Sequence, residues 1–310
     1  MNAFFIRTRR TFALLFACVA ALGGSGCREQ SASSPEAVSL GANVSTQRFA
    51  VKGVVRELKL DGRTVIIRHE EIPSYMEAMT MPFKVRDTNE LTRVTAGDEV
   101  AFRLNVTEDA SWIDEVRPTG RRESAAASSL PPAAPAVATN RPGEFTLASI
   151  PEFALTNEFG QPVSLRQFAG SAVAMTFFFT RCPVPEYCPR LSKNFQGAIV
   201  KLKARPDGPT NFHFLSVSFD PIDSPLVLRA YARGYNYDSN SWTFLTGNTT
   251  QITELAAGFG VFVKPDGGGF DHNFSTVIFD AAGRLQNMWP IGGDMTDQIV
   301  NDLVKGAAAR

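Results

Sequence analysis

The sequence predicts a mixed fold, in which a small all-β domain is followed by a larger α/β domain. Three observations lead to this prediction. The 310 residues exceed the usual size of a single domain. Residues 119–143 are rich in proline and alanine and hold too little large apolar surface to fold, so we expect a linker there. Before that linker the apolar residues alternate with the period of short strands, and after it strand and helix patterns follow one another.

The first 27 residues have the layout of a cleaved export signal. Arg7, Arg9 and Arg10 precede a short apolar stretch, and small residues then lead to Cys27. A helix that spans a membrane needs about twenty apolar residues, and this stretch is shorter. The position of Cys27 resembles that of the lipidated cysteine of bacterial lipoproteins. We therefore expect a lipid anchor at Cys27, a tether at 28–47 and residence on the periplasmic side of a bacterial membrane, with the Sec and twin-arginine export routes both open.

Charge and cysteine content narrow the class of function. The chain has 31 basic and 31 acidic residues, and removing the three signal arginines leaves 28 against 31, a net charge of −3. No basic patch or charge run predicts binding to nucleic acid. Cys18 and Cys27 belong to the predicted signal, so the mature domains keep Cys182 and Cys188. That pair could form one structural disulfide, but it does not make a disulfide-rich framework.

Residues 48–118 are expected to form the all-β domain. A strand at 49–58 breaks at Asp61-Gly62, which is a hairpin signal, and the chain resumes as a strand at 64–69. Further strands are predicted at 98–106 and 111–116. About seventy residues of short antiparallel strands suit a small barrel of the OB type.

Methionine and histidine side chains stand at regular positions in this domain. Met79 and Met81 fall on one face of a predicted strand, and His69 ends the strand 64–69. Packing in the barrel core would explain this arrangement. A site for Cu(I) would explain it as well, because thioether and imidazole ligands suit that ion better than Zn(II) or Mg(II).

Residues 144–310 predict the α/β domain. A hairpin is expected within 153–165, and the continuous apolar run 172–179 is typical of a buried central strand. The remaining elements are predicted as strands at 212–219, 242–245, 260–263 and 276–280 and as helices at 191–205, 225–234, 249–259 and 295–306.

Two cysteines follow the predicted central strand, and a histidine comes much later in the chain. Cys182 and Cys188 lie between that strand and the next helix, which is the thioredoxin-like arrangement. A helix N-terminus lowers the pKa of a thiol placed there. Together with His272 the two cysteines make a soft ligand set, which favours Cu(I), Zn(II) or thiol redox chemistry.

The all-β domain resembles a known copper-binding domain. The run at 69–83 is His-Glu-Glu-Ile-Pro-Ser-Tyr-Met-Glu-Ala-Met-Thr-Met-Pro-Phe, and Gly-Asp-Glu-Val follows at 97–100. Both are similar to the CusF-type periplasmic copper-binding domain. The resemblance implies that His69, Met79 and Met81 bind Cu(I). Some members cap the ion with a tryptophan just before the Met-Thr-Met motif, where this chain has Tyr75 and Met76, so Met76 is a further candidate ligand.

The α/β domain resembles a second family. The matching runs are Phe-Phe-Phe-Thr-Arg-Cys-Pro at 177–183, Cys-Pro at 188–189, Val-Ser-Phe-Asp-Pro-Ile-Asp-Ser-Pro at 217–225 and Asp-His-Asn-Phe-Ser-Thr-Val-Ile-Phe-Asp at 271–280. Together they resemble the SCO/SenC family of copper chaperones, which help to assemble the dinuclear copper centre of cytochrome c oxidase. The resemblance implies that Cys182, Cys188 and His272 hold copper, as Cu(I) or Cu(II). The family usually has three residues between its cysteines, whereas this chain has five, at 183–187.

The resulting interpretation is an exported, membrane-anchored copper metallochaperone. The first domain would capture Cu(I), and the second would hold copper for an acceptor protein such as a cytochrome c oxidase subunit. The linker would raise the effective concentration of one site at the other. Two alternatives stay open: Cys182 and Cys188 could be the redox-active pair of a thiol:disulfide oxidoreductase that keeps the cysteines of a copper-site protein reduced, or the chain could buffer periplasmic copper for resistance.

Overall fold

The structure, a computed structural model, describes residues 45–123, 146–290 and 293–309. These residues belong to one compact unit, Val44–Arg310. The predicted export signal with Cys27, the tether up to residue 44 and residues 124–143 of the predicted linker lie outside the described residues. The prediction began the linker too early, because residues 119–122 belong to the last strand of the first domain. None of the helices in the described ranges is both long and apolar enough to cross a membrane.

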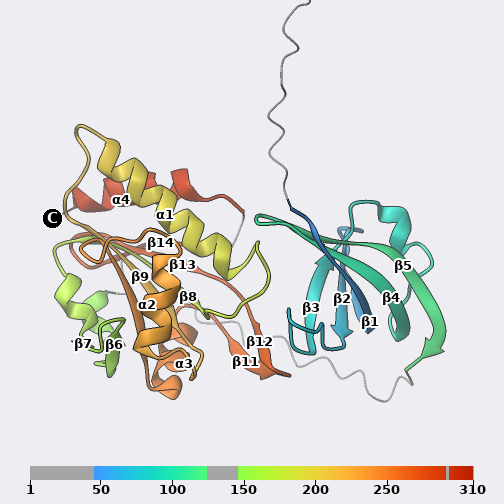
Figure 1. Ribbon diagram of the computed structural model, residues 1–310. Coiled ribbons are helices and arrows are strands. Elements are labelled where there is room, and N and C mark those ends of the chain that lie inside the picture. The colour runs from blue at the N-terminus through green and yellow to red at the C-terminus, as the bar shows by residue number, and fades with distance from the viewer. Residues whose placement is uncertain (1–44, 124–145, 291–292, 310) are drawn as a thin grey trace, which may run out of the picture. The chain divides into compact units, whose positions relative to one another are not determined.

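The first domain is a five-stranded antiparallel sheet that closes on itself (Figure 1). The strand order is β3-β2-β1-β4-β5. A bridge between Val85 and Ile113 joins the end of β3 to β5 and so connects the two edges. The strands are β1 (Gln47–Leu58), β2 (Thr64–His69), β3 (Met79–Lys84), β4 (Asp98–Val106) and β5 (Ser111–Arg122), with a 3-10 turn at Thr88–Leu91. We call this domain the barrel.

The hairpin between β1 and β2 confirms the turn predicted at Asp61-Gly62. Gly62 adopts a φ of 66°, which a residue without a side chain reaches at little cost. The Asp61 carboxylate accepts hydrogen bonds from the backbone N–H groups of Arg63 (2.9 Å) and Thr64 (2.8 Å). The turn thus satisfies its own polar groups and sets the register of the two strands.

Alternation along β3 also agrees with the prediction. Met79, Met81 and Phe83 are buried in the barrel core, whereas the residues between them are more exposed. His69, at the end of β2, is the direct cross-strand partner of Met79. The core face of the barrel therefore carries two thioethers and an imidazole at one end of neighbouring strands.

The second domain is built on a seven-stranded sheet with the order β14-β13-β8-β9-β10-β6-β7. The central strands β8, β9 and β10 are parallel, and the others are antiparallel to their neighbours. The strands are β6 (Leu155–Asn157), β7 (Pro162–Val163), β8 (Ala172–Phe178), β9 (Phe212–Ser218), β10 (Trp242–Gly247), β13 (Thr276–Phe279) and β14 (Leu285–Trp289). Every residue of β8 is buried, as expected of a central strand covered on both faces.

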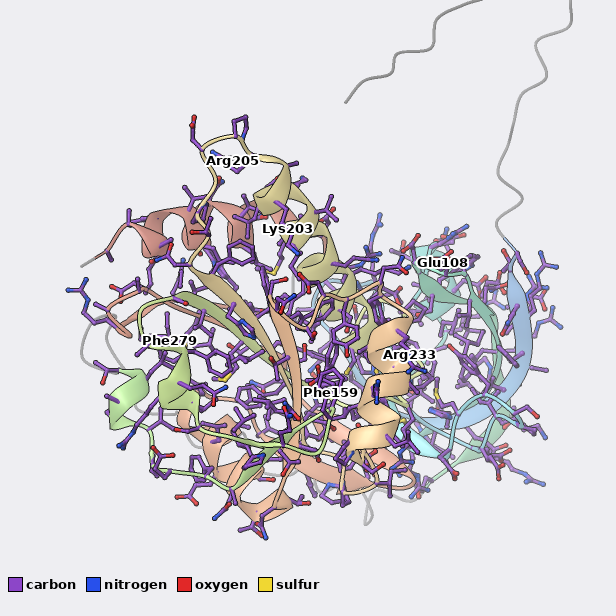
Figure 2. The ribbon with its side chains drawn as sticks, turned by 60° about the vertical axis from the view of Figure 1, so that its left-hand side comes forward. Glu108, Phe159, Lys203, Arg205, Arg233 and Phe279 are labelled. Atoms are coloured by element: carbon purple, nitrogen blue, oxygen red, sulfur yellow. The ribbon has the colours of Figure 1, made fainter. Side chains whose placement is uncertain are left out.

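Four helices pack on this sheet: α1 (Cys188–Ala204), α2 (Pro225–Arg233), α3 (Thr249–Gly258) and α4 (Thr296–Ala307). Phe178 meets Tyr231 of α2, and on the opposite face of β8 the ring of Phe177 stacks on Phe259, just after α3. Lys203 and Arg205 stand at the C-terminal end of α1 (Figure 2), where positive charge complements the helix dipole. We call this domain the α/β domain.

One predicted strand is misplaced. Residues 260–262 form a loop, because the side chain of Asn273 binds its backbone at Gly260 O (2.7 Å) and Phe262 N (2.8 Å). The strand lies at β11 (Val263–Asp266) and pairs with β12 (Gly269–His272) in a separate two-stranded sheet. We call this sheet the His272 hairpin, since it ends at that residue.

Candidate metal centre

The two cysteines lie at the point where the chain turns from β8 into α1. Cys182 lies in the loop, where its N–H donates to Phe179 O (3.4 Å), and Cys188 is the first residue of α1. Pro189 fits the first helical turn, which needs no backbone donor there. Both cysteines are buried and reduced. The helix begins three residues before the predicted start at residue 191, so Cys188 lies within it.

The two thiols differ in their tendency to ionise. Burial opposes ionisation of both, since a charged sulfur loses its hydration. At Cys182 this effect is outweighed by hydrogen bonds from the Cys188 thiol and from the N–H groups of Cys188 and Val184, and the pKa of Cys182 falls below its ordinary value. Burial and the neighbouring Cys182 raise the pKa of Cys188 well above its ordinary value. Cys182 is therefore the first thiolate of the pair.

Two buried aspartates hold the cysteine loop in place. Asp223 accepts hydrogen bonds from Thr180 N (2.9 Å), Thr180 Oγ1 (2.6 Å) and Ser218 Oγ (2.6 Å). Asp220 accepts from Arg181 Nε at 2.7 Å. Both aspartates thus have their charge compensated by donors from the loop that carries Cys182.

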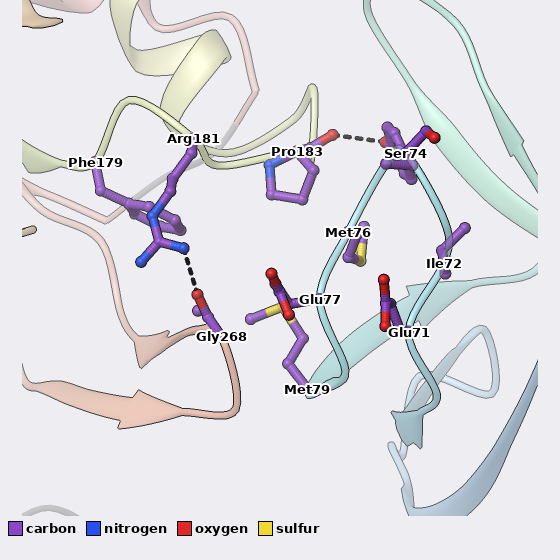
Figure 3. A pocket seen from close by; sticks show the side chains of 12 residues that line it. Glu71, Ile72, Ser74, Met76, Glu77, Met79, Phe179, Arg181, Pro183 and Gly268 are labelled. Atoms are coloured by element: carbon purple, nitrogen blue, oxygen red, sulfur yellow. Dashed lines mark hydrogen bonds between the residues drawn. The ribbon is translucent and has the colours of Figure 1, made fainter. Parts of the chain in front are cut away.

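Arg181 also connects the cysteine loop to the His272 hairpin. Its guanidinium donates to Gly268 O at 2.6 Å (Figure 3). The sequence alone did not single out this residue. Its position next to Cys182, with an aspartate available at Asp220, was the signal that could have found it.

His272 has one ring nitrogen free for a ligand. Its Nδ1–H donates to Asn273 O (3.0 Å), because a carbonyl can only accept, so Nε2 carries the lone pair. The ring packs edge-on against Phe179 and Phe219 and against Phe274. Burial lowers the pKa of His272 to about 4. The imidazole is therefore neutral, as a metal ligand must be, at neutral and mildly acidic pH.

The three candidate ligands of this domain do not form a closed cluster. Cys182 and His272 line one cavity of about 220 Å³, whereas Cys188 is fully buried beside Cys182 and does not line it. In the described part of the chain, no group of three or more His, Cys, Asp or Glu side chains is close enough to hold a metal ion. Binding by all three would need the imidazole and the thiols to approach one another.

The barrel brings its three candidate ligands together on one face. His69 and Met79 are cross-strand partners, and Met81 lies two residues further along β3. His69 Nδ1–H donates to Glu70 O (2.7 Å), and its buried Nε2 has no hydrogen-bond partner among the described residues. Burial lowers the pKa of His69, which keeps the ring neutral. A buried ring nitrogen without a hydrogen-bond partner, next to thioether sulfurs, suits a soft cation. Without such a ligand, nothing compensates the hydration that this nitrogen loses on burial.

The further candidate Met76 and two aromatic side chains of the barrel have distinct surroundings. Met76 is buried and lines, with Met79, the hollow drawn in Figure 3. Tyr75 stacks on Phe49 with ring centroids 4.5 Å apart. The guanidinium carbon of Arg86 lies over the ring of Trp112, 3.4 Å from the centroid of that ring. The face of the tryptophan is therefore already occupied by a cation.

Comparison with known proteins gives two family matches. The family model described as SCO1/SenC matches residues 142–308, and the one described as copper binding periplasmic protein CusF matches residues 48–118. No curated protein matches the chain.

Similar solved structures cover the α/β domain. A SCO1/SenC family lipoprotein from Bacillus anthracis has 26% identity and a TM-score of 0.47, over 55% of this chain and 99% of that one. The apo Sco1 protein from Thermus thermophilus has 30% identity and a TM-score of 0.40, over 49% and 90%. Copper-bound ScoI from Bradyrhizobium japonicum has 20% identity and a TM-score of 0.42, over 50% and 98%.

Proposed function

Because the chain belongs to the SCO1/SenC family, we propose that it is a copper metallochaperone whose second domain holds copper through Cys182, Cys188 and His272. The observation that carries this proposal is the cavity that Cys182 and His272 line together, with Nδ1 of His272 bound to Asn273 O and Nε2 left as the acceptor. Thiolate sulfur and neutral imidazole select a soft cation over Mg²⁺ or Ca²⁺. Copper is cargo in this function, taken up and passed on.

Each cysteine contributes differently to cargo binding. Cys182 ionises first and meets the ion first, because hydrogen bonds favour its thiolate. Cys188 loses its proton when copper binds, because the positive charge of the ion then stabilises the second thiolate and the hydrogen bond between the two sulfurs is lost. Binding of the pair therefore releases protons, and copper affinity rises with pH.

The barrel is proposed to capture Cu(I) through His69, Met79 and Met81, with Met76 as a further thioether. The match of the barrel to CusF supports this role, as does the unpartnered Nε2 of His69. Thioether ligands carry no charge, so they hold Cu(I) less strongly than thiolates do and can release it.

The destination of the copper is proposed to be a cytochrome c oxidase subunit, on the periplasmic side of a membrane to which lipidated Cys27 anchors the chain. The SCO1/SenC membership supports an acceptor of this kind, and the match to a periplasmic copper-binding domain supports the compartment.

A thiol:disulfide oxidoreductase is the second candidate function. The hydrogen bond between the two thiols and the unequal pKa values of Cys182 and Cys188 favour it, since disulfide exchange needs one ready thiolate beside a second thiol. Under this alternative the pair reduces the cysteines of a copper-site protein and is itself oxidised to a disulfide.

Copper stoichiometry and ligation distinguish the two functions. The reduced full chain is compared with its Cys182→Ser/Cys188→Ser and His272→Ala variants by metal analysis and X-ray absorption. The chaperone predicts two coppers, one in sulfur-rich ligation that both variants lose. Copper bound only in the barrel, together with disulfide exchange that survives His272→Ala, would favour the oxidoreductase.

A further inference from the structure

The cavity beside Cys182 is lined by residues of both domains. Met79 and Met81 of β3 contribute to its wall together with Cys182 and His272. Most of the other wall residues are aromatic or aliphatic, and two are polar: Pro82, Phe179, Pro183, Val184, Tyr187, Phe270 and Phe274, with Thr80 and Asp271. Two candidate ligands of each proposed site thus line one small, mostly apolar cavity of about 220 Å³, whereas His69, Met76 and Cys188 do not line it.

The loop between the two cysteines holds the barrel against this cavity. Pro183 O accepts a hydrogen bond from the Tyr75 hydroxyl at 2.6 Å (Figure 3). The Glu186 carboxylate accepts from Ser111 N (2.5 Å) and from Ser111 Oγ (2.9 Å). Both ends of the five-residue loop therefore bind the barrel by specific contacts.

The His272 hairpin makes a second contact with the barrel. Asp266 accepts a hydrogen bond from Thr80 N at 2.7 Å, between the two methionines of β3. A Cβ at Gly267 would lie 1.8 Å from Ala78 O, and one at Gly269 would lie 2.6 Å from Met79 Cε. The hairpin backbone thus packs directly on the segment that carries Met79.

Charged pairs at the N-terminal half of α1 make a third contact with the barrel. Lys193 pairs with Glu108 (3.0 Å) and Asp109 (2.8 Å), and Arg190 pairs with Asp109 (3.3 Å). Their acidic partners lie in the turn between β4 and β5, which carries the Glu108 labelled in Figure 2. Such exposed pairs add little stability, but they orient two surfaces that approach one another.

We propose that the docked barrel and cysteine loop form an internal transfer site, in which Cu(I) passes from Met79 and Met81 to Cys182 and His272 inside the shared cavity. This inference rests on the proposed chaperone function and adds its route. The step is a ligand exchange: the copper–nitrogen bond to His69 and the copper–thioether bonds break, a copper–sulfur bond to Cys182 and a copper–nitrogen bond to His272 Nε2 form, and each thiol that binds releases its proton to solvent. Copper stays Cu(I), so no oxidant or reductant is needed.

The docked route differs from exchange between two freely tethered domains. A tether only raises the effective concentration of one site at the other, and the ion crosses open solvent. In the shared cavity the ion keeps at least one protein ligand throughout. Transfer should therefore resist a bulky Cu(I) chelator such as bathocuproine disulfonate.

The test uses the full reduced chain, limiting Cu(I) and bathocuproine disulfonate, with the ultraviolet absorbance of the copper–thiolate bond followed by stopped flow. The docking variant is Glu186→Ala with Gly267→Asn, because asparagine tolerates the φ of 58° at this position while its Cβ meets Ala78 O. We expect the chelator to remove at least about ten times as much copper from this variant as from the wild type. Met79→Leu/Met81→Leu should lose copper to the same degree.

Controls separate the route from the function. Glu152→Ala removes an exposed carboxylate that pairs with Arg166 and should behave as the wild type. If the docking variant does not fold, Tyr75→Phe with Glu186→Gln replaces it, since these changes weaken the contacts without adding volume. Equal interception in wild type and docking variant would overturn the internal route and leave the chaperone function intact. Absence of the copper–thiolate band from the wild type without chelator would instead reject the chaperone function itself.

Docking itself has an independent readout. Thr80 N and Ser111 N donate to carboxylates of the other domain, so their amide hydrogen exchange should be slow in the wild type and faster in the docking variant. Rapid exchange at both amides in the wild type would contradict the docked arrangement.

Discussion

At the scale of single residues, backbone hydrogen bonds fix the tautomer of both proposed histidine ligands. His69 and His272 each donate Nδ1–H to the carbonyl of a following residue, Glu70 and Asn273, and this fixes the tautomer that leaves Nε2 as acceptor. The sequence placed both histidines as candidates. It could not show their tautomers, because these depend on the rotamer of each ring and on the local backbone.

The third histidine provides a prediction about pH. His213 lies between Phe168 and Thr243, and burial lowers its pKa from 6.5 to about 4. The unfolded chain binds the proton more readily, so this histidine destabilises the fold as pH falls from about 6.5 toward 4. Both proteins should lose unfolding free energy when the pH is lowered from about 7 to about 4.5. The loss in His213→Gln should be smaller than that in the wild type by about 2 to 3 kcal/mol, as measured by urea unfolding.

His69 and His272 contribute to the wild-type pH dependence in the same direction, since burial lowers the pKa of both. The comparison therefore rests on the difference between the two urea series. Identical slopes in wild type and variant would mean that His213 is solvated in the folded protein.

At the scale of elements, Arg181 joins the cysteine loop to the His272 hairpin and leads to a second prediction. Arg181→Met leaves the buried Asp220 without its cation and removes the bond to Gly268 O. We expect a loss of about 2 kcal/mol of unfolding free energy and faster amide exchange in β11 and β12. Arg166→Met, which breaks an exposed pair with Glu152, should cost less than about 1 kcal/mol and leave the hairpin amides protected.

Arg181→Lys tests the geometry of this connection. A single ammonium can pair with Asp220, but it lacks the forked donors that reach both the carboxylate and the carbonyl. The lysine variant should recover part of the stability while hairpin exchange stays fast. Full protection of the hairpin in Arg181→Met would show that its own β pairing is sufficient.

Most elements could be predicted because their apolar residues repeat with a clear period. The fully buried β8 and the alternating β3 are examples. β14 (Leu285–Trp289) escaped prediction because it is a mixed polar strand at the sheet edge. The misplaced β11 depended on the Asn273 side chain, a contact that the local pattern does not contain. Likewise, residue types predicted the candidate ligands, but the contacts of Glu186 and Asp266 with the barrel are set only by tertiary packing.

At the scale of the whole molecule, Cu(I) should stabilise each of the two domains through that domain's own ligands. A ligand that binds only the folded state stabilises it by about 4 kcal/mol when its free concentration is 1,000 times Kd. We expect Cu(I) to raise the unfolding temperature of both domains in the full chain, measured by differential scanning calorimetry. Cys182→Ser/Cys188→Ser should abolish the rise in the α/β domain and preserve the rise in the barrel. If the α/β transition still rises in that variant, the thiols are not the ligands.

The close approach of Gly267 to Ala78 O also has an evolutionary consequence. In a chain that has the α/β domain without a barrel, nothing would restrict this turn beyond its left-handed backbone, which asparagine or aspartate also adopts. In chains that fuse the two domains, a side chain there would collide with the barrel, and only glycine would be retained. The residue aligned with Gly267 should therefore differ with domain architecture. Asparagine or aspartate should occur there in relatives without a barrel and be selected against in chains that fuse the two domains.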